Sequence, residues 1–302
     1  MPPCLQCAKD FQITTTDATF YKKLEVPEPR MCPTCRHQHL MVWRNERTFY
    51  SATCAWCTKK MVSCFSPTSP FTVLCSECWW SDRFDPLKYG REFDFDRPFF
   101  EQFWDHMKAV PIGNLFIAFS ENSEYSNYSV GNKNCYMASG ADYNQDSFYV
   151  DNSNKNRDCG DVLFVNDSEL TYDSVDCVRC YNCVESQSLR DSNFCYFCID
   201  CIGCSECIGC TGLRQAKYHI FNKKFSREEY ERIKNEMQMD SFSGFQKVKK
   251  AFEEWKSRNP HHFETNFNSE QCTGQYVVNS KDCHDCRDVY QSQSCRHCGF
   301  VY

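Results

Sequence analysis

The sequence predicts a mainly β protein in which N-terminal modules held by cysteine pairs precede an irregular, cysteine-rich β-solenoid with a short helical hairpin inserted. Three observations carry this prediction. Paired C-x2-C motifs lie near the N-terminus, a long stretch rich in Asn, Asp, Ser, Tyr and Cys lacks helical periodicity, and two amphipathic helical patterns follow that stretch. The chain has 302 residues, of which 25 are cysteines, and 41% of it is hydrophobic, which is enough for several packed modules.

The first module contains two C-x2-C pairs, Cys4 with Cys7 and Cys32 with Cys35. Such pairs can place four thiolates at the corners of a tetrahedron, which is the arrangement of structural zinc sites. The stretch between the pairs alternates apolar and polar residues and then reaches two prolines, a pattern that predicts a β-hairpin ending in a turn. Residues 1–50 are therefore expected to form a first zinc ribbon.

A second module repeats this spacing, with Cys54 and Cys57 in CAWC and Cys75 and Cys78 in CSEC. Residues 51–95 are expected to form a second zinc ribbon. Four cysteines saturate zinc and leave no coordination position that could activate a water molecule. Both zinc ions are therefore predicted to be structural, and a chelator should unfold the two modules.

A short helix is predicted after the second module, within a connector that spans residues 96–118. Asp96 is the expected N-cap, and Pro111 is expected to end the helix. The apolar side of this helix is expected to pack against the zinc ribbons and consists of Phe99, Phe100, Phe103, Trp104 and Met107.

Residues 119–222 carry the solenoid prediction. Short apolar pieces such as SFYVDN and DVLFVND are separated at short intervals by Asn, Asp and Gly. In a β-solenoid each short strand stacks on the equivalent strand of the next coil, and Asn and Asp suit the corners because they tolerate left-handed backbone. Disorder is the alternative for so polar a segment, but its density of Tyr, Phe and Cys argues against disorder.

Two helical patterns predict a hairpin over residues 223–260. The first begins at Ser226 with a capping box to Glu229, and the second has an apolar face and stops before Pro260. Over residues 261–302 the Asn- and Cys-rich pattern returns, which predicts the start of a second solenoid module. A third zinc ion is an alternative interpretation there, on the C-x2-C pairs of Cys283, Cys286, Cys295 and Cys298.

Six cysteines recur at every third position in CYFCIDCIGCSECIGC, residues 195–210. An extended strand would point alternate members of this run to opposite sides, so all six can share a side only if the chain turns every few residues. A single strand also cannot wrap four thiolates around one metal. We favour a ladder of small apolar core residues over an additional metal site and over disulfides. Cys64 is likewise expected to be a buried strand residue.

Composition restricts the location and the partners of the protein. The N-terminus lacks the basic and apolar regions of a signal peptide, and no run approaches the roughly 18 apolar residues of a membrane helix. A cytoplasmic or other intracellular, reducing location is expected, with no membrane partner. Residues 1–60 hold nine Lys or Arg and five Asp or Glu, whereas residues 81–210 hold ten and 22. Contact with a polyanion is therefore expected only at an end of the chain.

A family resemblance accompanies these patterns. Over residues 4–36 the motif C-x2-C-x3-F, followed by D-x2-FY and P-x-P-R-x-CPTCR, resembles the zinc-ribbon domain common in uncharacterised bacterial proteins. The stretches WRNERTFY, CWWSDRFDPLKYGREFDFDRPFFEQF and GCTGLRQAKYHIFNKKFSREEYE are similar to a cysteine-rich, zinc-ribbon-containing family of candidate-phyla bacteria and giant viruses. The resemblance covers most of the chain and implies an architecture but no activity. His219 stands where that family would have cysteine, and its members run longer, so a short or truncated member is expected.

These features together predict a zinc-binding, non-enzymatic scaffold or interaction protein. Its partner is expected to be a protein or a nucleic acid, and no small-molecule substrate is evident. A nucleic acid could lie on the basic N-terminal end, although the aromatic residues there could instead fill a small core. The residues concerned are Arg36, His37, Arg44, Arg47, Lys59 and Lys60, with Trp43, Phe49, Tyr50 and Trp56.

Two other classes of function stay open from the sequence. A β-helix carbohydrate-active enzyme would use paired carboxylates, such as Asp158 with Asp161 or Asp173 with Asp176. An iron–sulfur or redox protein would use the cysteine run, which lacks the ending C-x3-C-P that bacterial ferredoxins have.

Overall fold

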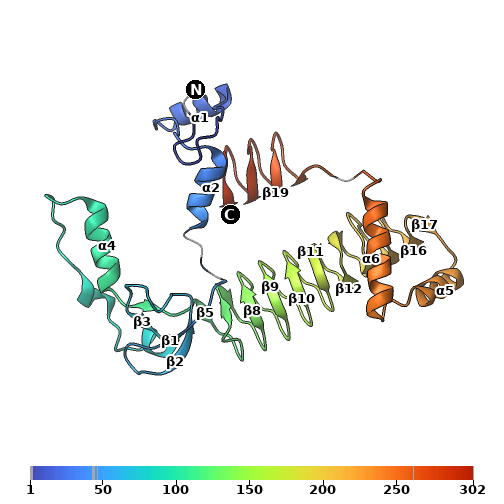
Figure 1. Ribbon diagram of the computed structural model, residues 1–302, viewed down its shortest axis with the longest axis horizontal. Coiled ribbons are helices and arrows are strands. Elements are labelled where there is room, and N and C mark those ends of the chain that lie inside the picture. The colour runs from blue at the N-terminus through green and yellow to red at the C-terminus, as the bar shows by residue number, and fades with distance from the viewer. Residues whose placement is uncertain (1–2, 43–44, 46, 261, 302) are drawn as a thin grey trace. The chain divides into compact units, whose positions relative to one another are not determined.

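The computed structural model describes residues 3–42, 45, 47–260 and 262–301. Over these residues the protein is mainly β, with a large mixed sheet. The chain forms two compact units, one made of Met1–Asn45 with His262–Tyr302 and the other of Glu46–His261. The first cysteine module and the C-terminal segment therefore belong to one unit, although they lie at opposite ends of the sequence (Figure 1).

The first module is helical, where the sequence pattern predicts a β-hairpin. A capping box starts helix α1 (Thr15–Lys23): the Thr14 hydroxyl accepts from the backbone N–H of Asp17 at 3.1 Å, and the Asp17 carboxylate accepts from the backbone N–H of Thr14 at 3.1 Å. This reciprocal pairing satisfies N–H groups that the helix start leaves free, and it outweighs the weak strand-like alternation. Helix α2 (Pro33–Met41) then begins at the second cysteine pair.

The C-terminal segment forms a parallel sheet in the same unit as the first module. The side chain of His297 lies 3.6 Å from the carboxylate of Asp17 in α1, and both side chains are mostly buried, so the sheet supports the first module directly. The strands, in their order across the sheet, are β18 (Thr265–Phe267), β19 (Gly274–Val278), β20 (Cys286–Tyr290) and β21 (Gly299–Val301).

The second cysteine module, in the other unit, contains an antiparallel hairpin, as expected for a ribbon. Strand β1 (Tyr50–Thr53) pairs with β2 (Lys60–Ser63). Trp79 stacks on Phe84 with ring centroids 4.4 Å apart, which gives this small module an aromatic core. Its further elements are β3 (Val73–Leu74), the short helix α3 (Ser76–Trp79), the 3-10 helix η1 (Pro86–Tyr89) and β4 (Ile112–Gly113), which pairs in parallel with β3.

Helix α4 (Phe99–Ala109) confirms the predicted connector helix, but Pro98 rather than Asp96 is its N-cap. The predicted packing of its aromatic side against the cysteine modules is wrong for most of the stripe. Trp104 contacts a phenylalanine ring of the second module, with centroids 5.8 Å apart. The stripe nevertheless stays 47–80% exposed at Phe99, Phe100, Phe103 and Trp104.

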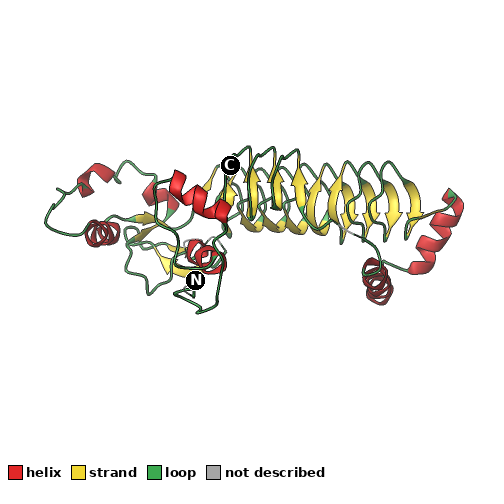
Figure 2. Ribbon diagram, turned by 90° about the horizontal axis from the view of Figure 1, so that it is seen from above, coloured by secondary structure: helices red, strands yellow, loops and turns green. Residues whose placement is uncertain are grey.

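The large sheet is built from strands that pair in parallel with a register of 12 residues, as Cys195 pairs with Cys207 and Val150 with Val162. Its last pair, β16 with β17, is antiparallel. Figure 2 shows the strands as successive arrows. The elements of this region are β5 (Ile117–Ala118), which pairs with β7 (Ser129–Val130), and β6 (Ser126–Asn127), β8 (Tyr136–Ser139), β9 (Phe148–Asp151), β10 (Gly160–Leu163), β11 (Tyr172–Val178), β12 (Tyr181–Val184), β13 (Gln187–Arg190), β14 (Asn193–Tyr196), β15 (Ser205–Ile208), β16 (Lys217–Ile220) and β17 (Lys223–Lys224).

A three-residue rhythm accompanies the register of the large sheet. Every third residue over 123–210 is buried, and every third residue over 128–221 has a positive φ. Residues of an extended strand would alternate between two sides. A left-handed residue between successive buried residues turns the chain each time, so the buried side chains gather in one core.

The cysteine run of residues 195–210 lies wholly inside this core. Each of its six cysteines is at most 1% exposed. The left-handed residue at every third position turns the chain often enough for all six cysteines to share a side. The thiols donate hydrogen bonds to backbone carbonyl groups, as Cys201 does to Ile199 at 3.4 Å.

Both helices of the predicted hairpin are confirmed. Helix α5 (Arg227–Met237) begins with the capping box of Ser226 and Glu229, and α6 (Phe242–Lys256) ends before Pro260. No helix among the described residues is long and apolar enough to cross a membrane. The hairpin packs on strands of the large sheet through a cluster that contains Phe197, Ile199, Ile208, Ile220, Tyr230, Val248 and Phe252.

Candidate metal centres

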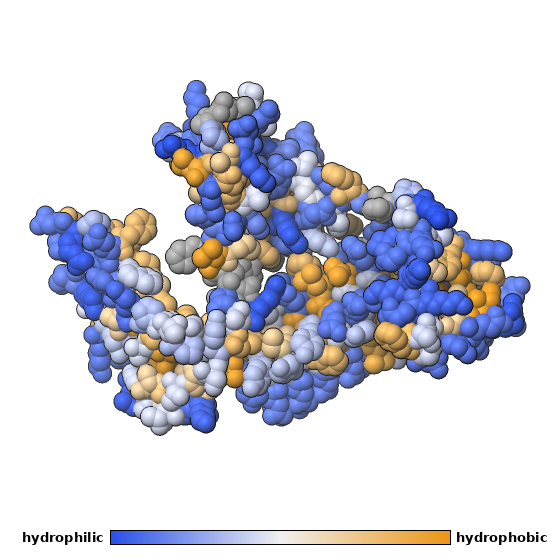
Figure 3. All heavy atoms as spheres, viewed as in Figure 1, coloured by the Kyte–Doolittle hydropathy of each residue, from blue (hydrophilic) through white to orange (hydrophobic). Residues whose placement is uncertain are grey.

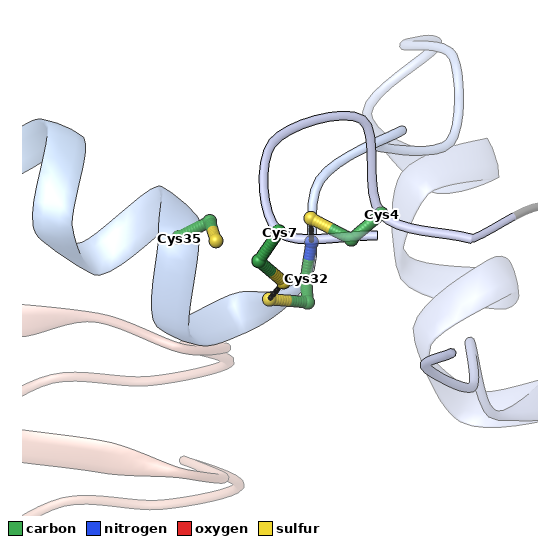
Figure 4. A group of neighbouring side chains, drawn as sticks. All are labelled: Cys4, Cys7, Cys32 and Cys35. Atoms are coloured by element: carbon green, nitrogen blue, oxygen red, sulfur yellow. Dashed lines mark hydrogen bonds between the residues drawn. The ribbon is translucent and has the colours of Figure 1, made fainter. Parts of the chain in front are cut away.

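The first centre forms where a tight turn meets the start of helix α2. In the turn, the N–H of Ala8, whose φ is 57°, donates to the carbonyl oxygen of Cys4 at 2.9 Å. Cys32 is the N-cap of α2, and Cys35 lies in its first turn. The sulfur atoms of these cysteines and Cys7 all lie within 4.8 Å of one another (Figure 4).

The second centre repeats this construction. Thr58 takes the place of the left-handed turn residue, with a φ of 60°, and its N–H donates to the carbonyl oxygen of Cys54 at 3.0 Å. Cys75 is the N-cap of α3, as Cys32 is of α2. The four sulfur atoms again lie within 4.8 Å of one another and belong to Cys54, Cys57, Cys75 and Cys78.

One hydrogen bond recurs in both centres. The backbone N–H of the third cysteine donates to the sulfur of the first, from Cys32 to Cys4 at 3.2 Å and from Cys75 to Cys54 at 3.3 Å. The sulfur atoms of the second and third cysteines are 3.9 Å apart in the first centre and 3.7 Å apart in the second. An N–H group aimed at sulfur stabilises the thiolate, which is the form that binds metal.

The thiols within each centre differ in acidity. Backbone hydrogen bonds, chiefly that from Cys32, lower the pKa of Cys4 to about 6. Burial raises the pKa of Cys54, but backbone hydrogen bonds within the centre outweigh burial and bring the pKa to about 6. Burial raises the pKa of Cys35 and of Cys78 to about 12. A bound cation would remove this difference, because a metal deprotonates the thiols that bind it.

Each centre could hold a metal ion through four sulfur ligands. Four thiolates around a divalent cation leave a net negative charge. At the second centre the hydrogen bond from Lys59 to Glu77, at 2.7 Å, is the main cause that raises the pKa of Lys59, and the charges of Cys75 and Cys57 raise it further. A metal ion in such a centre would stabilise the fold and have no open coordination position, since the protein supplies all four ligands.

Other cysteines that the sequence singles out lie outside these centres. Cys64 directly follows β2 and is partly buried, with its N–H donating to the carbonyl oxygen of Asn114 at 3.1 Å. The cysteines of the alternative third zinc site do not bring their sulfur atoms together in this way within the described ranges. They pack instead with three valines in the core of the C-terminal sheet, and are Cys283, Cys286, Cys295 and Cys298.

The basic residues considered for nucleic-acid contact are divided between the two units. Arg36 belongs to the first unit and Arg47 to the second. Arg47 is paired with the carboxylate of Asp151, and Lys59 with a glutamate of α3. Trp43 and Arg44 lie outside the described residues. The two ion pairs weaken the case for a basic surface.

The carboxylates considered for a β-helix enzyme occupy left-handed positions of the large sheet. Asp158, Asp161, Asp173 and Asp176 have φ angles of 46–54°. Burial raises the pKa of Asp176, whose carboxylate accepts a hydrogen bond from Arg190 at 2.7 Å. The other three carboxylates are exposed. Their backbone positions explain why aspartate recurs there, because it tolerates this conformation better than most residues.

An apolar cavity of about 680 Å³ lies beside the second centre. The side chains around it include several that are strongly exposed, among them Phe119 at 94% and Trp80 at 70%. The sequence pattern does not predict this cavity. Its aromatic lining includes Phe65, Trp79, Trp80, Phe116, Phe119 and Tyr128.

Comparison with known proteins adds no identification. No protein-family model matches the chain, and no curated protein sequence matches it.

Proposed function

We propose that the two centres hold structural zinc ions and that the protein is a non-enzymatic, intracellular scaffold. The observation that carries the proposal is the matched geometry of the two centres, in which four protein sulfur atoms and the same N–H to sulfur bond recur. Zinc favours a tetrahedral set of this kind, and a set supplied wholly by protein is structural rather than catalytic. A reducing location agrees with the free thiols throughout the chain.

We further infer that residues 119–222 and the C-terminal strands are β-solenoid modules. The register of 12 residues and the burial of every third residue support this inference, because coils of constant circumference would produce both. A solenoid gives a scaffold an extended surface for partners while its core stays closed.

A protein is the partner that the surface favours. Residues 81–210 carry ten basic and 22 acidic residues, a balance that repels nucleic acid. Exposed aromatic side chains around the apolar cavity are instead typical of protein interfaces. Figure 3 shows one face of the molecule, on which hydrophobic residues lie among hydrophilic ones. Nucleic-acid binding that weakens steeply with salt and disappears with a chelator would contradict this choice.

Metal analysis of the purified, reduced full-length protein tests the zinc proposal. Two zinc ions per chain are expected, and Cys7→Ser and Cys57→Ser should each remove one of them, because each opens one tetrahedral set. Cys64→Ser is the matched control and should remove none, since Cys64 lies outside both centres. Bound iron, or a zinc content that neither ligand variant lowers, would exclude the proposal.

A further inference from the structure

The core of the large sheet becomes rich in sulfur over residues 177–210. In residues 195–206 all four of the buried every-third positions are cysteine, and the next two continue the run. The nine buried cysteines of this region are Cys177, Cys180, Cys183, Cys195, Cys198, Cys201, Cys204, Cys207 and Cys210.

Packing alone does not require cysteine at these positions. The register of the sheet places Ser186 beside Cys198 and Ser192 beside Cys204, and each serine hydroxyl accepts a hydrogen bond from the backbone N–H of its neighbouring cysteine at 3.2 Å. Residues of similar size therefore fill equivalent places in the same core. The concentration of thiols over a few adjacent segments calls for a chemical reason rather than a steric one.

The cysteines of this region lie in neighbouring segments of one core. The register of the sheet places Cys195 between Cys183 and Cys207, its partners in the two neighbouring strands. The thiol of Cys198 donates a hydrogen bond to the carbonyl oxygen of Cys207, in the neighbouring segment, at 3.5 Å. These four cysteines are free, and each is at most 1% exposed. The sulfur atoms of the run are thus spread over several segments and do not close around one point.

This open arrangement suits a metal that accepts few sulfur ligands. Over the described residues, no three sulfur atoms of the run all lie within 4.8 Å of one another, so the run lacks the closed set that zinc needs. Cu(I) is a soft cation that thiolates select, and a pair of thiolates satisfies it. We propose that Cu(I) binds in this core, between neighbouring thiols of Cys195, Cys198, Cys201, Cys204, Cys207 and Cys210.

Binding of Cu(I) is an exchange of cations without a redox step. Each thiol that becomes a ligand releases its proton to solvent, and each Cu(I) offsets the charge of one of its two thiolates. Copper enters and stays as Cu(I), so no oxidant or reductant is consumed. Uptake should therefore acidify a weakly buffered solution.

The fold supplies its own test variant. The triple variant replaces three cysteines of the run by residues that occupy the equivalent positions in other segments of the core. Its substitutions are Cys198→Ser, Cys201→Ala and Cys204→Ser. The matched control, Cys135→Ser with Cys159→Ser, removes two buried cysteines of the same core that lie outside the run. Far-UV circular dichroism checks that both variants fold.

The zinc-loaded full-length protein is titrated with Cu(I) under anaerobic conditions against a chromogenic Cu(I) chelator. In one arm Cu(I) is added to the folded protein. In the other it is added during refolding, because the folded core is closed to solvent. Zinc release is followed in parallel, since Cu(I) can also displace zinc from the two centres. The wild type and the control should take up copper beyond the zinc they release, and the triple variant should lose most of that uptake.

Three outcomes would overturn the proposal: no uptake in either arm, uptake fully matched by zinc release, or equal uptake by the triple variant and the wild type. If the triple variant fails to fold, Cys207→Ser with Cys210→Ser takes its place. This double variant removes the two thiols of the run that follow residue 206. It should lower the uptake of copper in proportion to the number of thiols removed.

Discussion

At the residue scale, Gly274 absorbs an irregularity in the C-terminal sheet. The step from Ser269 to Ser280 is 11 residues long, one fewer than the 12-residue step that follows it from Ser280 to Ser292. Gly274 has a φ of +136°, a conformation that other residues rarely adopt. A Cβ atom there would lie 2.0 Å from the carbonyl oxygen of Cys286, which is the β-sheet partner of Gly274. The shortened step therefore depends on glycine.

Gly274→Ala should destabilise the first unit by about 3 kcal/mol or more, since it combines backbone strain with a clash against paired backbone. Gly212→Ala is the matched control. Gly212 also has a positive φ, of +69°, but an added Cβ would meet nothing within 4 Å. That variant should therefore lose only about 1–2 kcal/mol. Urea unfolding followed by circular dichroism compares the two, and equal losses would show that the clash carries no cost.

The sequence predicts which sulfur atoms come together at the two centres, because a C-x2-C turn is a local structure and two such turns match each other. It predicts the left-handed positions only in part. Asn134 and Asp158 fit the expectation that Asn and Asp take this conformation. Phe164 and Leu170 take it as well, although nothing in their side chains favours it. At those positions the register of the sheet decides the backbone.

At the element scale, the helical hairpin is held by an aromatic layer between α6 and the large sheet. Phe252 is 3% exposed. Its ring centroid lies 6.1 Å from that of Phe197 in the sheet region and 6.3 Å from that of Trp255 in α6. Burial of aromatic rings of this size is a large part of what docks a short hairpin.

Phe252→Ala should lower the free energy of unfolding by about 3–5 kcal/mol, because it leaves a cavity in a buried layer. Phe242 begins the same helix but is 82% exposed, so Phe242→Ala should change stability by less than about 0.5 kcal/mol. Thermal unfolding monitored by tryptophan fluorescence reports on the layer through Trp255. A small effect of the Phe252 variant would mean that the hairpin is not docked as described.

The helices differ in how far the sequence predicts them. Helices α5 and α6 combine apolar periodicity with clear start signals, so both are predicted. Helix α1 was missed because its capping box uses Asp17 where Glu or Gln is usual, and because its polar surface gives almost no apolar stripe. The apolar stripe of α4 predicts that the helix has an apolar face, but it does not predict which residues contact that face.

At the scale of the whole molecule, the union of the first cysteine module with the C-terminal sheet is the feature that sequence patterns do not show. The contact between Asp17 and His297 joins opposite ends of the chain. Hydrophobic periodicity, caps and cysteine spacing are local signals, and two segments that meet only after folding leave no local trace in one sequence. The boundaries of the predicted domains stay predictions.

The 12-residue register predicts that the large sheet tolerates the loss of one whole step. Deleting residues 159–170 brings Thr171 to the place of Cys159, and every later core position keeps its phase. The shortened protein should fold with a similar circular dichroism spectrum. Deleting one residue fewer should unfold the region, because each core side chain would move out of phase. Two equally stable deletion proteins would contradict the register.

The last strand in a stack of parallel strands is an edge strand, and its unpaired N–H and C=O groups can pair with a strand of another chain. The end of the large sheet is not left open in this way. Strand β17 folds back antiparallel on β16, pairing Lys223 with Ile220 and Lys224 with His219, and both lysines are exposed. Charge and reversed direction make a poor template for another strand. The two lysines therefore oppose end-to-end pairing of these sheets into fibres, which the regular strand register would otherwise favour.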